Sequence, residues 1–269
     1  MTNRLQIAWL TSGRGPGSYG ALEFLLKAID DGLTVDIAVV FVNRAAGEAE
    51  PTDRLMDMVR GRGIALETLS SVAFRRGQGG KRAEQGEPLP AWRGEYDKEV
   101  VRLLGRHTFD FGVMFGYMLI ATEALYGAYT FLNDHPALPG GPVGTYQEVI
   151  AELIRRRAPE SGCLMNIVTG DLDRGPVVSY CRFPIWDASN QILWRWDYPP
   201  DQLVAGTREN LPLFHDIRAR GVARERPFLV ETLRALTEDE LQIPPANPLD
   251  LTAKVEAAML KGAREAASR

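Results

Sequence analysis

The sequence predicts an α/β fold built on a parallel sheet that helices cover on both faces. Residues 5–10 and 35–42 are near-continuous apolar runs, which are typical of strands buried on both sides. Between them, residues 21–29 carry apolar side chains at helical spacing. A strand, a helix and a second strand in this order indicate parallel strands with helical crossovers.

The same patterns predict the next elements of the chain. Further strands are expected at residues 63–69, 109–115 and 129–133, and further helices at residues 53–62, 97–105 and 147–157. Residues 12–20 form a glycine-rich turn. Residues 75–90 are basic and glycine-rich, and we expect a mobile surface loop there.

The pattern changes in the last hundred residues. Strands 164–169 and 176–185 are expected to form an antiparallel pair around the turn at residues 170–175. Residues 210–236 predict a long helix, with a break expected near residues 221–227. We expect one catalytic domain over residues 1–242, with halves 1–117 and 118–242, and a helical tail over residues 243–269 that packs on the body or on a partner chain.

Composition narrows the class of protein. A net charge of −4 with 45% hydrophobic and 25% charged residues is typical of a soluble globular protein, and we expect an enzyme with small-molecule substrates. It gives no indication of nucleic acid or a membrane surface as partner. No apolar run approaches the roughly 20 residues of a membrane span, and no secretory signature is present, so we expect a cytoplasmic protein. A homodimer is left open.

Several residues are expected to have structural roles only. Cys163 and Cys181 lie in apolar runs and are expected to be buried free thiols, with no metal site. His107 and His215 are expected on the surface. The tryptophans at positions 186, 194 and 196 belong to an apparent insertion, residues 186–203, and are expected to pack rather than to stack on a ligand.

The segment around residues 131–142 carries the clearest chemical signal. Asn133 and His135 end an apolar run, and alternation along a strand places both side chains on one side. Pro136 then stops the strand. An amide and an imidazole together can hold a carbonyl oxygen and stabilise the charge that develops on it. Asp173, in the later turn, could orient the imidazole or take a proton through water.

The glycine-rich turn suggests an anion site. Gly15, Gly17 and Gly20 match a dinucleotide fingerprint, but residues 41–44 offer no acid for a ribose, which disfavours a nicotinamide cofactor. Backbone N–H groups at a helix N-terminus can still bind an anion. A tight turn without a ligand is the alternative.

Together these motifs resemble the folate-dependent formyltransferase family, and within it the glycinamide ribonucleotide formyltransferases. The resemblance covers residues 7–185, with Asn-x-His-Pro at 133–136 and Leu-Asp-x-Gly-Pro-Val at 172–177 as its strongest parts. It implies a twisted, mostly parallel sheet with a Rossmann-like N-terminal half. It also implies formyl transfer from 10-formyltetrahydrofolate, as co-substrate, to an amine, with glycinamide ribonucleotide of purine synthesis as the leading acceptor, and no metal.

The resemblance also implies residue roles. Asn133 would bind the formyl oxygen, His135 would stabilise the oxyanion, and Asp173 would pair with His135. The residues implied for the acceptor and its phosphate are Ser12, Gly13, Arg14, Gly15, Gly17, Ser18, Tyr19 and Arg93. Those implied for the folate are Met118, Leu119, Ile120, Val168, Thr169, Gly170 and Asp171.

Departures from the family pattern keep alternatives open. The phosphate loop usually reads Ser-Gly-x-Gly-Ser-Asn, whereas residues 12–19 include two extra positions and end in Tyr19. Leu119 replaces an arginine, and Asp134 replaces an apolar residue. Transfer to a different amine, hydrolysis of 10-formyltetrahydrofolate, and a non-catalytic folate-binding protein are the alternatives.

Overall fold

The computed structural model describes residues 4–82, 87–195 and 198–267. The chain forms two compact units. Unit 1 comprises Met1–Asn133 and Ile167–Asp171, and unit 2 comprises Asp134–Asn166 and Leu172–Arg269. Residues 118–133, expected in the second half, belong to unit 1 because their strand pairs with a strand of that unit. The expected tail, residues 243–269, is part of unit 2.

The strands of unit 1 pair in the order β3-β2-β1-β4-β5, and every one of these pairs is parallel. Their bounds are β1 (Leu5–Thr11), β2 (Val35–Val42), β3 (Leu66–Thr68), β4 (Phe111–Met114) and β5 (Phe131–His135), the last of which runs on into unit 2. Six of the eight residues of β2 are buried, as expected for a strand between two helical layers. The predicted parallel α/β architecture is therefore confirmed.

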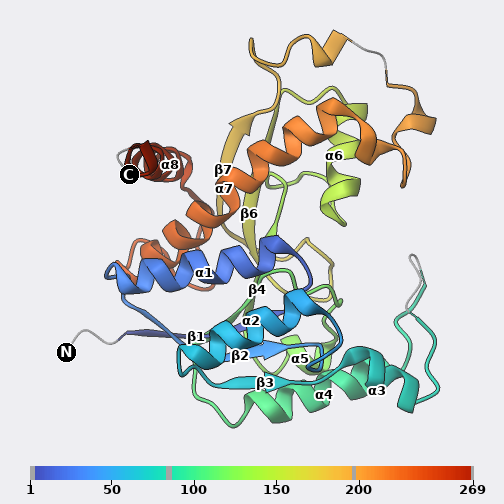
Figure 1. Ribbon diagram of the computed structural model, residues 1–269, viewed down its shortest axis with the longest axis vertical. Coiled ribbons are helices and arrows are strands. Elements are labelled where there is room, and N and C mark those ends of the chain that lie inside the picture. Colours follow the sequence, from blue (N-terminus) through green and yellow to red (C-terminus); the bar gives the residue numbers. More distant parts are fainter. Residues whose placement is uncertain (1–3, 83–86, 196–197, 268–269) are drawn as a thin grey trace. The chain divides into compact units, whose positions relative to one another are not determined.

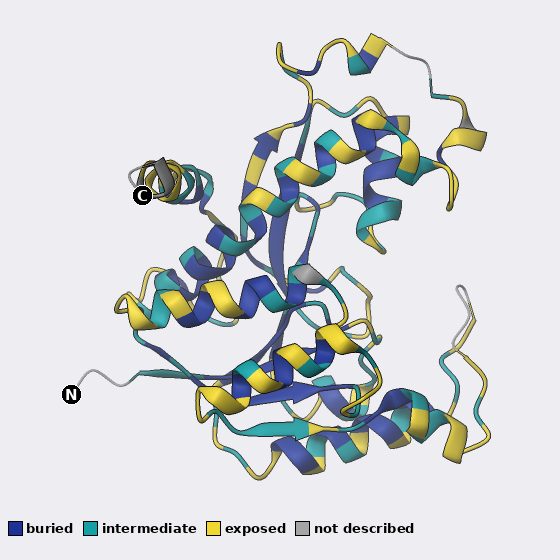
Figure 2. Cartoon of the chain, in the orientation of Figure 1, coloured by how far each residue is buried: buried dark blue, intermediate teal, exposed yellow. Residues whose placement is uncertain are grey.

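Helices cover both faces of these strands. They are α1 (Pro16–Asp30), α2 (Glu50–Gly61), α3 (Ser71–Gly77), α4 (Trp92–Leu104) and α5 (Glu123–Tyr126). In Figure 1, α1 and α2 lie on one face of the strands, and α3, α4 and α5 lie on the other. Figure 2 shows buried residues on the strands and exposed residues on the outer turns of α1 and α2. The right-handed rule for parallel crossovers accounts for this division.

Helix α1 begins earlier than the sequence analysis predicts. Its first residue is Pro16 rather than position 21, so the glycine-rich turn ends at Gly15. Proline is favoured in the first turn of a helix because its fixed φ suits that position and its missing N–H would have no intrahelical partner. The second half of the expected turn is therefore helical.

Part of the expected basic loop is also helical. Ser70 caps α3 by accepting a hydrogen bond from the Ala73 N–H, and Arg75 and Arg76 lie in the last turn of this helix. Arginine near a helix C-terminus interacts favourably with the helix dipole. The expectation of a loop from residue 75 is therefore wrong for residues 75–77, and residues 83–86 lie outside the described part of the chain.

Unit 2 contains an antiparallel pair, as predicted. Strands β6 (Glu160–Ile167) and β7 (Val177–Pro184) pair antiparallel, and the short β8 (Leu249–Asp250) pairs parallel to β7. Cys163 and Cys181 face each other across β6 and β7, and both are buried free thiols, as expected.

The helices of unit 2 are α6 (Tyr146–Arg155), α7 (Pro212–Thr237) and α8 (Thr252–Ala267). The expected break in the long helix is wrong, because α7 is continuous through Pro227. Pro227 removes one intrahelical donor. The buried Phe228, Leu229 and Leu233 anchor this part of α7, which shows packing outweighing local propensity. Leu251, directly before α8, and Val255, in its first turn, are buried, and α8 contacts α7 and β7.

The tryptophan-rich segment is structural where it is described. It contains the short 3₁₀ helices η1 (Leu193–Arg195) and η2 (Pro200–Gln202), and η3 (Arg208–Asn210) follows it. Trp186 stacks on the buried Trp194 at 5.1 Å between ring centroids, and the Trp194 indole donates to the Ile185 carbonyl at 2.7 Å. The expectation of packing is confirmed for both, and Trp196 lies outside the described residues. Among the described residues, no helix has both the length and the apolar character that a membrane span requires.

Candidate active site

Strand β5 carries two of the three residues expected to be catalytic. Phe131 and Leu132 are fully buried and anchor the strand. Asn133 pairs with Met114 of β4 at the end of unit 1, and His135, which is 3% exposed, is the last residue of the strand. Because side chains alternate along a strand, Asn133 and His135 belong to the same face of β5.

The imidazole of His135 is held by two oxygen atoms of unit 2. Its Nε2 lies 2.8 Å from the carbonyl oxygen of Pro142, and its Nδ1 lies 3.6 Å from Oδ2 of Asp173. A carbonyl oxygen only accepts hydrogen bonds, so Nε2 carries a proton in this arrangement. The other nitrogen then faces the carboxylate, which can receive or stabilise a proton there. The structure therefore brings His135 and Asp173 together, as expected.

Asp173 is placed by an unusual backbone conformation. Its φ is 54°, in the left-handed region that aspartate adopts more readily than most residues. The Gly144 N–H donates to its Oδ2 at 3.1 Å, and the side chain is 10% exposed. The turn thus aims a nearly buried carboxylate at the histidine.

A cavity of about 250 Å³ contains this pair. The other residues that line it are Leu138, Gly140, Gly141, Pro142, Leu164, Arg174, Gly175 and Val177. Arg174 is exposed and brings a positive charge to the rim. The sequence analysis did not single out Arg174, although it lies between Asp173 and Gly175 of the motif. A small group can therefore reach the pair beside apolar walls.

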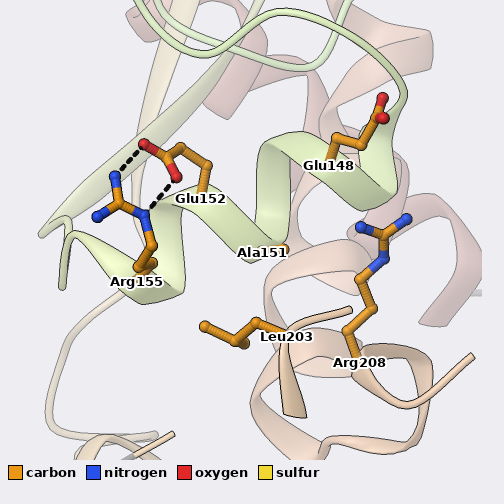
Figure 3. A pocket seen from close by; sticks show the side chains of 6 residues that line it. All are labelled: Glu148, Ala151, Glu152, Arg155, Leu203 and Arg208. Carbon is orange, nitrogen blue, oxygen red and sulfur yellow. Dashed lines mark hydrogen bonds and ion pairs between the residues drawn. The ribbon is translucent and has the colours of Figure 1, made fainter. Parts of the chain in front are cut away.

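A second cavity in unit 2, of about 260 Å³, lies along α6 (Figure 3). It is lined by Glu148, Ala151, Glu152, Arg155, Leu203 and Arg208. Glu152 pairs with Arg155 at 2.6 Å and with Arg156 at 2.5 Å, which lowers the pKa of the Glu152 carboxyl to about 2. The charges of Glu152 and Arg155 in this cavity are paired with each other, and that of Arg208 is paired with Glu209, which makes the cavity a poorer candidate for catalysis than the His135 cavity.

In unit 1, the start of the expected acceptor loop, residues 12–19, lies beside the expected folate segment, residues 118–120. The Ser12 N–H donates to the Gly116 carbonyl at 3.0 Å, and the Met118 N–H donates to Ser12 Oγ at 3.2 Å. Gly13 has φ 64°, a conformation that favours glycine. A Cβ on Gly116 would lie 2.3 Å from Ser18 Oγ, so Ser18 also approaches this segment closely.

The rest of the acceptor loop leads into α1. Arg14 is exposed, Gly15 is the residue before the helix, and Gly17, Ser18 and Tyr19 lie in its first turn. The free backbone N–H groups of such a turn attract anions. The loop therefore combines backbone donors and hydroxyl groups at the carboxyl end of β1, where ligands of open α/β sheets bind.

Arg93 is buried rather than displayed on the surface. It is 2% exposed, and its Nη2 donates to Asp97 Oδ1 at 3.2 Å and to the Ile120 carbonyl at 2.7 Å. Its guanidinium also lies over the rings of Trp92 and Tyr96. Burial raises the pKa of Asp97, and the charge of Arg93 offsets part of that shift. Arg93 thus supports the backbone at Ile120.

The expected folate residues present an apolar surface. Met118 is 68% exposed and Ile120 is 44% exposed, whereas Leu119 between them packs against the core of unit 1, as Val168 does. Thr169, Gly170 and Asp171 form a short turn in which the Asp171 N–H donates to Thr169 Oγ1 at 3.3 Å. Exposed apolar side chains of this kind suit packing against a flat heterocycle.

Within the described part of the chain, buried side-chain atoms without a hydrogen-bond partner occur in both units, with Asp134 Oδ1 as an example in unit 2. Among the described residues, no hydrogen-bond partner is found for Arg93 Nη1, Tyr117 Oη, Thr122 Oγ1 or either side-chain atom of Asn43. Such atoms are uncommon in proteins because desolvation without a hydrogen bond is costly.

The remaining histidines lie elsewhere. His215 is exposed, as expected. The expectation for His107 is wrong, because its side chain is 20% exposed and its Nε2 lies 3.1 Å from Glu67 Oε1. Glu67 is 40 positions away in the sequence, so no local pattern reveals this contact. Within the described part of the chain, no group of three or more His, Cys, Asp or Glu side chains could hold a metal ion.

Comparison with known proteins supports the family resemblance. No family model matches the chain. The phosphoribosylglycinamide formyltransferase of Escherichia coli (strain K12) is 25% identical over 194 residues, which cover 70% of this chain and 76% of that protein.

Solved structures establish the fold. A glycinamide ribonucleotide transformylase from Symbiobacterium toebii matches with a TM-score of 0.63 and 20% identity, covering 92% of this chain and 94% of that one. A formyltetrahydrofolate deformylase from Pseudomonas putida KT2440 matches with a TM-score of 0.59 and 15% identity, covering 92% of this chain and 70% of that one. The expected formyltransferase-type fold is therefore confirmed.

Proposed function

We propose that this chain, a member of the folate-dependent formyltransferase family, transfers a formyl group from 10-formyltetrahydrofolate to an amine. The observation that carries the proposal is the pair of His135 and Asp173, whose Nδ1 and Oδ2 atoms lie 3.6 Å apart in a cavity. His135 follows Asn133 by two residues on β5. The leading acceptor is glycinamide ribonucleotide, which the names of several similar proteins contain or imply.

The three side chains have complementary roles in the proposed reaction. 10-Formyltetrahydrofolate supplies an electrophilic formyl carbon. The Asn133 amide donates to the formyl oxygen, and protonated His135 stabilises the negative charge that grows on this oxygen when the amine attacks. Asp173 stabilises the imidazolium and takes up the proton that the attacking amine loses, directly or through water. Collapse of the tetrahedral intermediate releases tetrahydrofolate, whose nitrogen regains a proton.

The acceptor is proposed to bind at the Ser12 to Tyr19 loop. The backbone N–H groups at the start of α1, with the hydroxyl of Ser18 and the charge of Arg14, suit a phosphate. We propose that Arg93 does not contact the acceptor but supports the expected folate segment from within the protein, since its side chain is buried and donates to the Ile120 carbonyl.

The folate is proposed to contact Met118, Leu119 and Ile120 and the segment at residues 168–171. The exposed side chains of Met118 and Ile120 would pack on the pterin, and backbone groups of both segments would bind its polar edge. The proposal invokes no metal ion, because Asn133 and His135 supply the polarising groups.

A second candidate function is hydrolysis of 10-formyltetrahydrofolate. The shared fold with a formyltetrahydrofolate deformylase favours it, because water can replace the amine at the same tetrahedral step. The altered acceptor loop, with Tyr19 at its end, also keeps a different amine open.

Absorbance changes on deformylation of a 10-formyl folate distinguish these functions. We expect turnover only when glycinamide ribonucleotide is present. Turnover with water alone would establish the hydrolase, and turnover with another amine would replace the acceptor. Donor binding without turnover, in water or with any of a panel of amines, would contradict catalysis and indicate a binding protein.

A further inference from the structure

Asp173 is held by the start of α6 as well as by its own turn. We propose that Gly144 and Glu148 are positioning residues for Asp173, acting through the backbone between them. The inference rests on the proposed function, because it concerns the carboxylate that serves His135 in that reaction.

The first link is a single hydrogen bond from the main chain. The Gly144 N–H donates to Asp173 Oδ2 at 3.1 Å, and this same oxygen lies 3.6 Å from His135 Nδ1. A shift of the peptide before Gly144 therefore moves the oxygen that faces the histidine. Displacements of about 1 Å at reacting groups can lower rates by ~100-fold.

The second link is the capping box of α6. Glu148 Oε2 accepts hydrogen bonds from the Thr145 N–H at 2.7 Å and from Thr145 Oγ1 at 2.9 Å. The Glu148 N–H in turn donates to Thr145 Oγ1 at 3.4 Å. Glu148 thus fixes the peptide after Gly144, while Asp173 binds the peptide before it.

The conformation of Gly144 joins the two links. Its φ of 102° lies in the region that favours glycine, and a Cβ at this position would lie 2.5 Å from Glu148 Oε2. Any larger residue would force the Glu148 carboxylate away or rotate one of the two peptides. Glycine at this position allows both hydrogen bonds to form at once.

A matched control lies one helical turn further along α6. Figure 3 shows Glu148 and Glu152 on the same helix, with the Glu152 carboxylate directed to Arg155. Glu152 also contacts Arg156. Loss of the Glu152 carboxylate removes the same charge from the same helix without touching the capping box.

The test compares Glu148→Ala, Glu148→Gln and Glu152→Ala in steady-state kinetics with both substrates varied, alongside thermal unfolding. We expect Glu148→Ala to lower kcat ~10-fold with both KM values within about twofold of wild type. Glu148→Gln keeps a capping acceptor and should recover most of kcat. Glu152→Ala should retain wild-type kcat. Gly144→Ala should lower kcat ~100-fold.

A Glu148→Ala variant with lower thermal stability but wild-type kcat would overturn the proposal, because the capping box would then be structural only. A fall in kcat equal to that of Glu152→Ala would overturn it as well. If Gly144→Ala does not fold, the Glu148 variants still test whether the capping box positions Asp173. Failure of the proposed function would look different, since wild-type protein would then not deformylate the donor with any amine or with water.

Discussion

The residues expected to be functional in the two units differ in how their buried polar groups are partnered. In unit 2, both nitrogens of His135 face oxygen atoms, and Asp173 accepts a hydrogen bond from Gly144. In unit 1, Arg93 Nη1, Tyr117 Oη and the Asn43 amide are buried without hydrogen-bond partners among the described residues. Unit 2 also contains such an atom, Asp134 Oδ1, but its His135–Asp173 pair is ordered by the protein itself.

The two units also differ in how closely their sequences follow the family pattern. The motif around His135 and Asp173 follows the family pattern closely, and the acceptor loop departs from it at Tyr19 and in length. We infer that the chemistry is carried by unit 2 and by Asn133 at its border, and that the choice of acceptor is carried by unit 1.

The largest effect is expected at the reacting pair. His135→Ala should lower kcat by ~100-fold or more, because it removes both the oxyanion partner and the proton carrier. Steady-state kinetics measure the loss, and His215→Ala, at an exposed position, is the control. A His135→Ala enzyme with near-normal turnover would show that His135 of unit 2 takes no part in the reaction.

Arg93→Ala should affect stability before it affects binding. It leaves the carboxylate of Asp97, which is fully buried, without its ion-pair partner, and should cost about 3 kcal/mol in the free energy of unfolding. Urea denaturation measures this, with Arg102→Ala as an exposed control on the same helix. Unchanged stability with a raised acceptor KM would instead support the role expected from the sequence, direct contact with the acceptor's phosphate.

Tyr19→Ala tests whether the altered loop selects the acceptor. Tyr19 lies in the first turn of α1, near the guanidinium of Arg54. Loss of one good contact should raise the acceptor KM ~10-fold and leave the donor KM within about twofold. Phe24→Ala, at an exposed position on the same helix, is the matched control. Equal changes in both KM values would show that Tyr19 does not act on acceptor binding alone.

The smallest effect concerns the surface of α6. Arg155 and Arg156 lower the pKa of Glu152 from its ordinary value of 4.5 to about 2. The contribution of these ion pairs to the stability of the fold is therefore fully present above about pH 4.5 and is lost as pH falls through about 2. Glu152→Gln should lower the free energy of unfolding by less than about 1 kcal/mol at pH 7, and the difference from wild type should vanish near pH 2. A deficit that persists at low pH would show that packing, not charge, is responsible.

Local sequence patterns predict the buried strands and the reacting motif well. The observed bounds of β2 match the apolar run at residues 35–42, because a strand buried on both sides is apolar throughout. The antiparallel pairing of β6 and β7 likewise follows from two apolar runs around a polar turn. The meeting of His135 and Asp173 was expected from the two family motifs together.

Features that depend on distant contacts were not predictable in this way. The continuity of α7 through Pro227 depends on packing of Phe228 and its neighbours. The buried pairing of Arg93 with Asp97 and Ile120 joins residues whose roles look independent in the sequence. Gly144 has no local signature, and its hydrogen bond to Asp173 joins residues 29 positions apart.

The most direct test of the central claim is mass-spectrometric detection of the formylated amine. Wild-type protein and His135→Ala are incubated with 10-formyltetrahydrofolate and glycinamide ribonucleotide, and donor binding is measured in parallel. We expect wild type to form formylglycinamide ribonucleotide. We expect His135→Ala to bind the donor but to form ~100-fold less product. Equal product from both proteins, or none from wild type, would contradict it.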